Sequence, residues 1–320
     1  MDVSILIVSF NTLAMTRACL ESLYRETTEV EYEVIVVDNA SADGSARMIA
    51  REFPQARLHA LEENVGFGRA NNLAAIDAQG DYVLLLNSDT VVLDHAIDKL
   101  VAFARMHPQA GVYGGRSLFG DGRLNPQSVW GNPSLWSELC VGLGLSVVFP
   151  RSKLFNPRYL GSWQRDSERR VDIVSGSYLL MDVALWKALG GFDERFFMYG
   201  EDVDLCLRAK QLGYHCLFTP DSEIIHHGGG SEKIAADKMI RLFRAKAQLY
   251  HKHWPPLGAR IGIVLLDLWV ATRLVTIGAL SWFRPGFRPA ATKWRKIWAS
   301  RAQWHLSGDP AATPQPTCLT

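Results

Sequence analysis

The sequence has few cysteines and no pattern that cysteine chemistry needs. Five cysteines are spread over 320 residues, at positions 19, 140, 206, 216 and 318, and no two form a Cys-x-x-Cys pair. An odd number of widely spaced cysteines predicts neither a disulfide framework nor a zinc knuckle. We therefore expect a protein that works in a reducing, cytoplasmic compartment.

The sequence also lacks a strong net charge and a secretion signal. Its formal net charge is +1, and the first ten residues, Met-Asp-Val-Ser-Ile-Leu-Ile-Val-Ser-Phe, contain no basic region and no small-residue cleavage site. Their apolar run is too short for a signal peptide and is expected to form a first strand instead. No nucleic-acid partner is expected, and nothing in these residues specifies an oligomeric state.

Short apolar runs alternate with helical patterns in the first third of the chain. The runs cover residues 4–9, 33–37, 57–61, 82–86 and 112–115, and the helical patterns cover 14–25, 43–52, 69–78 and 94–106. Such alternation predicts βαβ units with right-handed crossovers and a mostly parallel sheet. We expect residues 1–116 to form a nucleotide-binding α/β layer.

The middle of the chain is less regular. Residues 117–170 are rich in Gly, Pro, Trp and Arg, which predicts a long loop that covers a substrate. Regular structure is expected to resume with a strand, two helices, a second strand and a third helix, over 171–181, 182–189, 201–212, 222–226 and 232 to about 251. Residues 117–231 are expected to complete the same domain.

The C-terminal region, 232–306, is expected to be helical and basic. Residues 261–283 are apolar except for Asp267 and Arg273, and a charge at the centre of a spanning helix costs roughly 2.5–3.5 kcal/mol, which disfavours a span. From residue 251 onward there are nine Lys or Arg, two Asp and six of the ten Trp. This composition favours an interfacial helix on an anionic membrane leaflet. Packing on the core or on a second subunit is the alternative, and residues 307–320 are expected to be disordered.

Polar residues follow the apolar run of residues 82–86. Asn87, Ser88 and Asp89 end a segment that reads as a buried parallel strand. Open α/β sheets bind ligands at the carboxyl ends of their strands, so Asp89 is a candidate metal or ligand residue. A turn that caps the helix near Asp94 is the alternative.

Asp38 and Asn39 end the second predicted strand and fall on the same sheet edge. A carboxylate there can accept a hydrogen bond from the N3–H of uracil or thymine, although a turn or a cap is the alternative. For Asp43, which precedes Gly44 and Ser45, the helix-start role is favoured.

The segment Asn64-Val-Gly-Phe-Gly-Arg follows the third strand and opens the third helix. Its glycines permit close approach of a ligand, and the helix N-terminus with Arg69 offers positive potential to a diphosphate. It lacks the position and third glycine of the dinucleotide fingerprint, and a plain loop is the alternative.

Three acids, Glu201, Asp202 and Asp204, lie in the first turn of a predicted helix. The helix dipole favours negative charge there whatever the function. A preceding aromatic run, however, predicts that one carboxylate is partly desolvated, which suits a general base. Such a base contributes about 10²–10⁴ in rate.

His226 and His227 end the last predicted strand, before three glycines at 228–230. Adjacent strand residues face opposite ways, so only one of the two can share the Asp89 site. A structural or solvated histidine pair is the alternative, and the glycine run is expected to form a segment that closes over substrate.

Taken in order, these segments resemble an inverting nucleotide-sugar glycosyltransferase of family 2 with the GT-A fold, and more narrowly its bacterial rhamnosyltransferase-like branch. The resemblance rests on six segments, which are residues 3–11, 36–41, 64–72, 86–90, 190–205 and 226–231. It implies a GT-A α/β domain with a helical C-terminal tail.

The resemblance also implies roles for individual residues. The nucleotide-sugar pocket would be formed by Ser9, Phe10, Asn11, Asp38, Asn39, Asn64, Arg69 and Ser88, with Asp38 on the pyrimidine. Asp89 would hold Mg²⁺ or Mn²⁺ on the diphosphate, with His226 as a further ligand. Asp202 would be the base, and Glu201 would orient the acceptor. Asn87 replaces the first Asp of the family's Asp-x-Asp motif, which removes one negative charge from the metal site.

The implied reaction transfers a sugar from a dTDP- or UDP-sugar, with dTDP-rhamnose preferred, to a saccharide or polyprenyl-diphosphate-linked acceptor. The expected setting is cell-envelope polysaccharide synthesis at the inner face of the membrane. Two rivals are a nucleotidyltransferase, whose glycine- and lysine-rich phosphate loop does not occur near the N-terminus, and a non-catalytic protein that binds sugar nucleotide or glycan.

Overall fold

The computed structural model describes residues 1–228 and 235–305, which fall into two compact units. The first, here called the sheet unit, consists of Met1–Gly131, Trp163–Phe197 and Glu201–Ser231. The second, the helical unit, consists of Asn132–Ser162, Met198–Gly200 and the chain from Glu232 onward. Part of the segment expected at 117–231 thus packs with the C-terminal helices.

The sheet unit is built on a nine-stranded sheet, whose strand order is β3-β2-β1-β4-β10-β6-β11-β5, with β8 paired to β11. The first four strands, β1 (Val3–Ser9), β2 (Tyr32–Asp38), β3 (Arg57–Ala60) and β4 (Tyr82–Leu86), are parallel, as the alternating pattern predicts. Antiparallel β10 (Tyr178–Asp182) joins them to the parallel pair β6 (Gly111–Leu118) and β11 (His215–His226). The α/β fold is confirmed.

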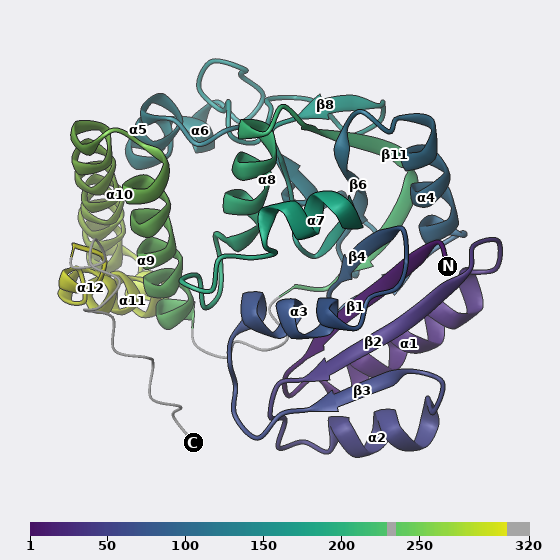
Figure 1. The fold of residues 1–320 in the computed structure, drawn as a ribbon. Helices are drawn as coiled ribbons and strands as arrows, with labels where there is room; N and C mark the ends of the chain where they lie inside the picture. The colour runs from purple at the N-terminus through teal and green to yellow at the C-terminus, as the bar shows by residue number, and fades with distance from the viewer. Residues whose placement is uncertain (229–234, 306–320) are drawn as a thin grey trace. The chain divides into compact units, whose positions relative to one another are not determined.

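Helices cover both faces of this sheet (Figure 1). One face carries α1 (Leu13–Glu26), α2 (Ser45–Glu52) and α4 (Ala96–Met106), whose apolar residues share one core cluster with Ile5 and Leu84. The other face carries α3 (Phe67–Ile76), α7 (Val183–Leu189) and α8 (Glu201–Gln211). With apolar packing on both sides, β1 and β4 read as continuous apolar runs.

Three expectations for the middle of the chain are wrong. Residues 117–170 are not one loop, because they contain α5 (Leu135–Leu143), α6 (Leu145–Val148) and β7 (Val129–Trp130). A capping box at Ser134 starts α5, but its residues are almost all apolar, so the helical period is faint. Residues 171–181 form parts of three strands, β8 (Arg169–Val171), β9 (Ile173–Val174) and β10. The last strand begins at His215, earlier than expected.

The helical unit also contains α9 (Ala235–His253), α10 (Pro256–Phe283), α11 (Arg288–Ala299) and α12 (Ala302–His305). Helix α10 begins at a proline soon after the end of α9, because proline is tolerated in the first turn of a helix. Its 28 residues meet the length and composition requirement for a membrane span, although the sequence argument counted Asp267 and Arg273 against one. The expected closing segment at 229–231 and the expected disorder at 307–320 lie outside the described residues.

A buried charge cluster holds the helical unit together. Lys246 of α9 donates to Glu138 of α5 at 2.6 Å, and Arg158 donates to the same carboxylate oxygen at 3.3 Å. Burial and the charge of Arg158 lower the pKa of Lys246 to about 8, although Glu138 opposes this shift. Removing one partner of such a pair leaves an uncompensated charge in the interior.

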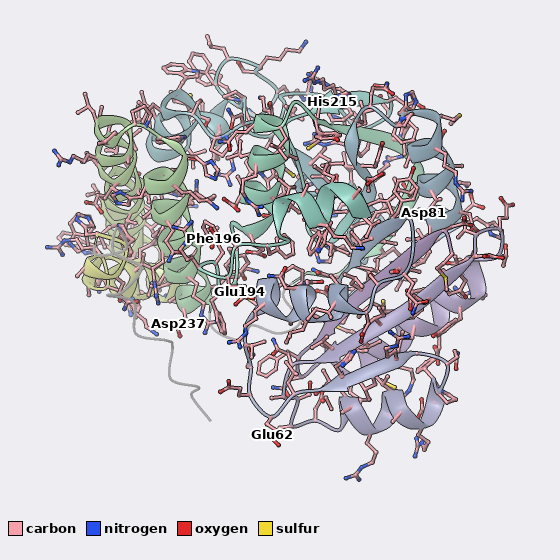
Figure 2. All side chains as sticks on the ribbon, in the orientation of Figure 1. Glu62, Asp81, Glu194, Phe196, His215 and Asp237 are labelled. Carbon is pink, nitrogen blue, oxygen red and sulfur yellow. The ribbon has the colours of Figure 1, made fainter. Side chains whose placement is uncertain are left out.

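We expect Glu138→Gln to destabilise the fold by about 3–5 kcal/mol, because Lys246 and Arg158 would stay buried without a carboxylate. The double variant Glu138→Gln/Lys246→Met should recover part of this loss. Urea unfolding measures both changes. Glu62→Gln, at an exposed position (Figure 2), is the control. An unchanged midpoint for Glu138→Gln contradicts the argument.

Candidate active site

The predicted polar residues gather at the carboxyl ends of three neighbouring strands. Ser9 is level with Asp38 in the pairing of β1 and β2, and Leu6 is level with Leu85 in the pairing of β1 and β4. The residues after β4 therefore lie beside the end of β1. Their proximity is direct, since the hydroxyls of Ser88 and Thr12 are 3.2 Å apart.

Asp38 offers one carboxylate oxygen to a ligand. Its Oδ1 accepts a hydrogen bond from the Ser41 amide at 2.9 Å, whereas Oδ2 is buried and has no partner. The residue as a whole is 2% exposed. A buried acceptor left unpaired costs about 1–3 kcal/mol, so a donor group of a ligand would be favoured there. Asn11 shapes the same loop by accepting from the Ala42 amide at 2.8 Å.

Two asparagines tie the second strand to the glycine loop. Asn39 Nδ2 donates to Asn64 Oδ1 at 3.0 Å, and Asn39 Oδ1 accepts from the Val65 amide at 2.9 Å. Gly66 has φ +88, and a Cβ there would lie 2.5 Å from the Phe197 carbonyl oxygen, so no other residue fits. Both predicted asparagines thus set the backbone of the loop that opens α3.

Three other predicted pocket residues differ in accessibility. Ser9 is buried, and its hydroxyl lies 3.0 Å from that of Thr16, inside a network that also holds Thr12. Phe10 is half-buried at the end of β1. Arg69 is exposed, and its guanidinium is 3.8 Å from the Glu194 carboxylate, which lies beside α3 in Figure 2.

Asp43 has the helix-start role that the sequence favours. Its Oδ1 accepts from the Ser45 amide at 3.0 Å, and its Oδ2 accepts from the Leu13 amide at 2.9 Å. Both carboxylate oxygens are therefore used to join the starts of α1 and α2.

Asp89 and one of the two histidines come together. His226 Nε2 is 3.3 Å from Asp89 Oδ1 and 3.4 Å from Asn87 Nδ2. Burial by itself raises the pKa of the Asp89 carboxyl, but the hydrogen bond and charge of His226 outweigh it, so the pKa lies below its usual value. His227 faces elsewhere, toward Gly120, as the alternation of strand residues predicts.

These groups fit a divalent cation that is shared with a substrate. Among the described residues, no group of three or more His, Cys, Asp or Glu side chains is placed to hold a metal ion. The Asn87 Oδ1 atom, however, is buried without a partner near the Asp89–His226 pair. Mg²⁺ is usually held by one or two carboxylates together with substrate phosphates, and imidazole suits transition metals. A single carboxylate with His226 is thus a sufficient protein half-site.

Asp202 is fixed close to the same edge. Its Oδ2 accepts from the Gly176 amide at 3.0 Å, and its Oδ1 accepts from the Val203 amide at 2.8 Å. The residue after Gly176, Ser177, accepts from the Asn87 amide at 3.0 Å. A short run of backbone therefore connects the predicted base to the predicted metal motif.

Glu201 occupies a different environment from its neighbour. It is 6% exposed, and its Oε2 atom is buried without a partner. Burial first, and then the negative charge of Asp202, raise the pKa of the Glu201 carboxyl well above its usual value. Its surroundings therefore favour the neutral form of the carboxyl. Its expected role in orienting the acceptor stays a prediction.

Two positioning residues were not predicted. Asn72 of α3 accepts from the Phe192 amide at 2.8 Å and donates to the Phe192 carbonyl at 2.9 Å, which clamps the loop before α8. Asn72 lies in a segment that the sequence singled out, so its motif was a signal. Gly176, which holds Asp202, stands in no recognisable motif.

A mostly parallel sheet whose polar residues gather at one edge, with a carboxylate fixed close to that edge, fits a glycosyltransferase of the GT-A type. The sequence profile described as "Glycosyl transferase family 2" matches residues 4–158, and that of "Glycosyl transferase family group 2" matches residues 153–283. The chain belongs to glycosyltransferase family 2, in its rhamnosyltransferase-like branch.

The similar proteins agree with this assignment. The chain is 33% identical over 215 residues to N-acetylglucosaminyl-diphospho-decaprenol L-rhamnosyltransferase of Mycobacterium tuberculosis, an alignment covering 62% of this chain and 68% of that protein. It is 28% identical over 255 residues to rhamnosyltransferase WbbL of Escherichia coli, covering 75% and 88%.

Among solved structures, the mannosyltransferase PcManGT of Pyrobaculum calidifontis, in complex with GDP-Man and Mn²⁺, has a TM-score of 0.58 at 18% identity. That match covers 96% of this chain and 88% of the other. At this identity the likeness shows the fold alone.

The Glu201 carboxyl predicts a pH dependence of stability. Because its pKa is raised in the folded state, its proton stabilises the fold fully below the ordinary pKa of 4.5, and this stabilisation is lost as pH rises toward the folded pKa. As pH rises above 4.5 toward the folded pKa, the wild-type protein should therefore lose stability relative to Glu201→Gln. Urea midpoints measure the difference. Glu21→Gln, an exposed control, should show no such trend. A constant difference for Glu201→Gln argues against a neutral acid.

Proposed function

We propose that this glycosyltransferase moves L-rhamnose from dTDP-rhamnose to a saccharide or polyprenyl-diphosphate-linked saccharide at the cytoplasmic face of the cell membrane. The observation that carries the proposal is the backbone link between Asp202 and the segment Asn87–Asp89, which supports a base acting close to a metal half-site. The similarity to two rhamnosyltransferases favours the sugar.

The donor would be recognised at the sheet edge. The free Oδ2 of Asp38 would accept the N3–H of the pyrimidine, and the loop fixed by Asn39 and Asn64 would approach the diphosphate with Arg69. Thymine and uracil present the same N3–H, so a UDP-sugar fits this pocket equally well. Activity with a panel of donor sugars distinguishes a dTDP-sugar from a UDP-sugar.

Asp89 and His226 would hold Mg²⁺ or Mn²⁺, with Asn87 Oδ1 at hand. Such an ion, when bound, stabilises the charge that builds on a leaving diphosphate. The lowered pKa of Asp89 keeps that carboxylate ionised at neutral pH, as a ligand must be.

Asp202 would accept the proton of the acceptor hydroxyl. The hydroxyl oxygen would then form its bond to the anomeric carbon as the bond to the diphosphate breaks on the opposite side, which inverts the configuration. Two backbone N–H groups hold the carboxylate in one orientation, so no reorganisation is needed when the proton arrives.

We expect Asp202→Asn to lower turnover by about two to four orders of magnitude, with little change in donor affinity, because a general base acts mainly in the transition state. Nucleoside diphosphate release, with Mg²⁺, lipid-extracted acceptor and a panel of dTDP-, UDP- and GDP-sugars, measures turnover. Calorimetry measures donor affinity.

Asp166→Asn removes the same charge from an exposed position and is the control. Release from a donor other than dTDP-rhamnose would overturn the sugar but keep the reaction. Undiminished release in Asp202→Asn would remove it as the base, and no release from any donor with a competent acceptor would favour a non-catalytic binding protein.

We expect Asp89→Ala to abolish the part of donor affinity that depends on Mg²⁺ or Mn²⁺, because the half-site would lose its only carboxylate. Calorimetric titration of donor with and without the metal measures this part. Asp94→Ala, an exposed acid five residues on, should keep the metal dependence. If Asp89→Ala keeps it too, Asp89 is not a ligand.

A further inference from the structure

An apolar stripe runs along helix α10. Residues 257, 261, 264, 268, 271, 275, 278 and 282 follow one another in alternating steps of four and three, the spacing of a single helix face. They are Leu, Ile, Val, Leu, Ala, Val, Gly and Trp, and none of them is buried. At the C-terminal end of the helix, Trp282 is 83% exposed and Phe283 is 82% exposed.

Two of the three charges inside α10 do not belong to this stripe. Arg273 donates to the carbonyls of Val141 and Gly142, at the C-terminal end of α5, at 2.9 and 2.6 Å. Asp267 accepts from Trp304 Nε1 at 3.0 Å and lies 2.8 Å from His305. Both thus face other helices of the same unit. The third charge, Arg260, is exposed near the N-terminal end of the stripe, so the outer face of α10 is apolar from residue 261 onward.

A second apolar segment adjoins α10 within the helical unit. The guanidinium of Arg273 lies 3.7 Å from the Cβ position of Gly144, from which α6 begins. Val147 and Val148 of α6 are 73% and 68% exposed, and Phe149 after them is also exposed. We call the α10 stripe, together with Phe283, the apolar face. Two elements far apart in the sequence thus expose apolar side chains in this unit.

The charge around the apolar face has one sign. Within 132–162, 198–200 and 235–305 there are sixteen Lys or Arg and three Asp or Glu, a formal charge of +13 in a protein whose total is +1. All three acids have partners inside the unit, since Glu138 pairs with Lys246, Asp237 with Lys296 and Asp267 with His305. No acid of the described helical unit is therefore left to attract a basic partner.

An apolar face on a strongly basic unit favours one class of partner over the others. A second copy of the chain would bring two strongly positive surfaces together without acids between them, which costs affinity. A nucleic acid would match the charge but would leave the aromatic and aliphatic residues in water. An anionic lipid surface satisfies both, because apolar side chains enter the acyl boundary while Lys and Arg meet the headgroups.

We propose that the apolar face docks the helical unit on an anionic lipid bilayer, with Trp282 and Phe283 in the interface and Arg284 and Arg288 among the headgroups. The inference deepens the proposed function, because a lipid-linked acceptor lies in a membrane. Its test measures binding to lipid and does not depend on glycosyl transfer.

The test is cosedimentation of the full chain with vesicles of phosphatidylglycerol and, separately, of phosphatidylcholine. The wild-type protein should bind phosphatidylglycerol and bind phosphatidylcholine far more weakly. Trp282→Ser/Phe283→Ser should weaken binding to phosphatidylglycerol by about tenfold or more, because two aromatic side chains no longer enter the interface. These side chains are exposed, so the fold and the donor affinity should be unchanged.

Ile76→Ser/Met106→Ser is the matched control, since both residues are exposed apolar side chains of the sheet unit, at 76% and 69%. Its binding should equal that of the wild type. Equal binding by Trp282→Ser/Phe283→Ser, or no binding of the wild type to phosphatidylglycerol, overturns the proposal. So does a dimer, seen by light scattering without lipid, that the same variant dissociates. Loss of turnover with normal vesicle binding would count against the proposed function alone.

Discussion

The parallel pairing of β1 with β2 and β4 is the constraint on which the site depends. The three strands pair in a fixed parallel register. Because they are buried on both faces, their polar residues are found near the strand ends. Asp38, Ser9 and Asn87–Asp89 therefore reach the same edge. Burial of this kind leaves two oxygen atoms, Asp38 Oδ2 and Asn87 Oδ1, without partners in the protein, which favours a polar ligand there.

The second half of the sheet unit brings the base to this edge through antiparallel β10. That strand pairs with β4, so the turn before it lies beside Asn87, and the Gly176 amide in this turn holds the Asp202 carboxylate. From the other side, Asn72 holds the loop before α8 against the helix that follows the glycine loop. Donor loop and base are thus parts of one hydrogen-bonded framework, and neither can shift far without the other.

The two units divide the charge of the protein as well as its structure. The near-neutral total conceals a formal charge of +13 in the described part of the helical unit, whose three acids there are all paired internally. The same unit exposes apolar residues along α10 and in α6. Composition alone pointed to a basic, Trp-rich tail, but the inward direction of Asp267 and Arg273 is what leaves the outer face of α10 apolar from residue 261 onward.

The sequence by itself determined the α/β order, the parallel first half and the edge residues, because each depends on local periodicity and on polar residues that end apolar runs. It also indicated that only one of His226 and His227 can reach Asp89, since strand residues alternate. Tertiary structure alone decided that α5 and α6 lie within the expected loop, that Gly176 anchors Asp202 and that Glu201 is buried with a raised pKa. These features depend on contacts between residues distant in the chain, and such contacts leave no period in the sequence.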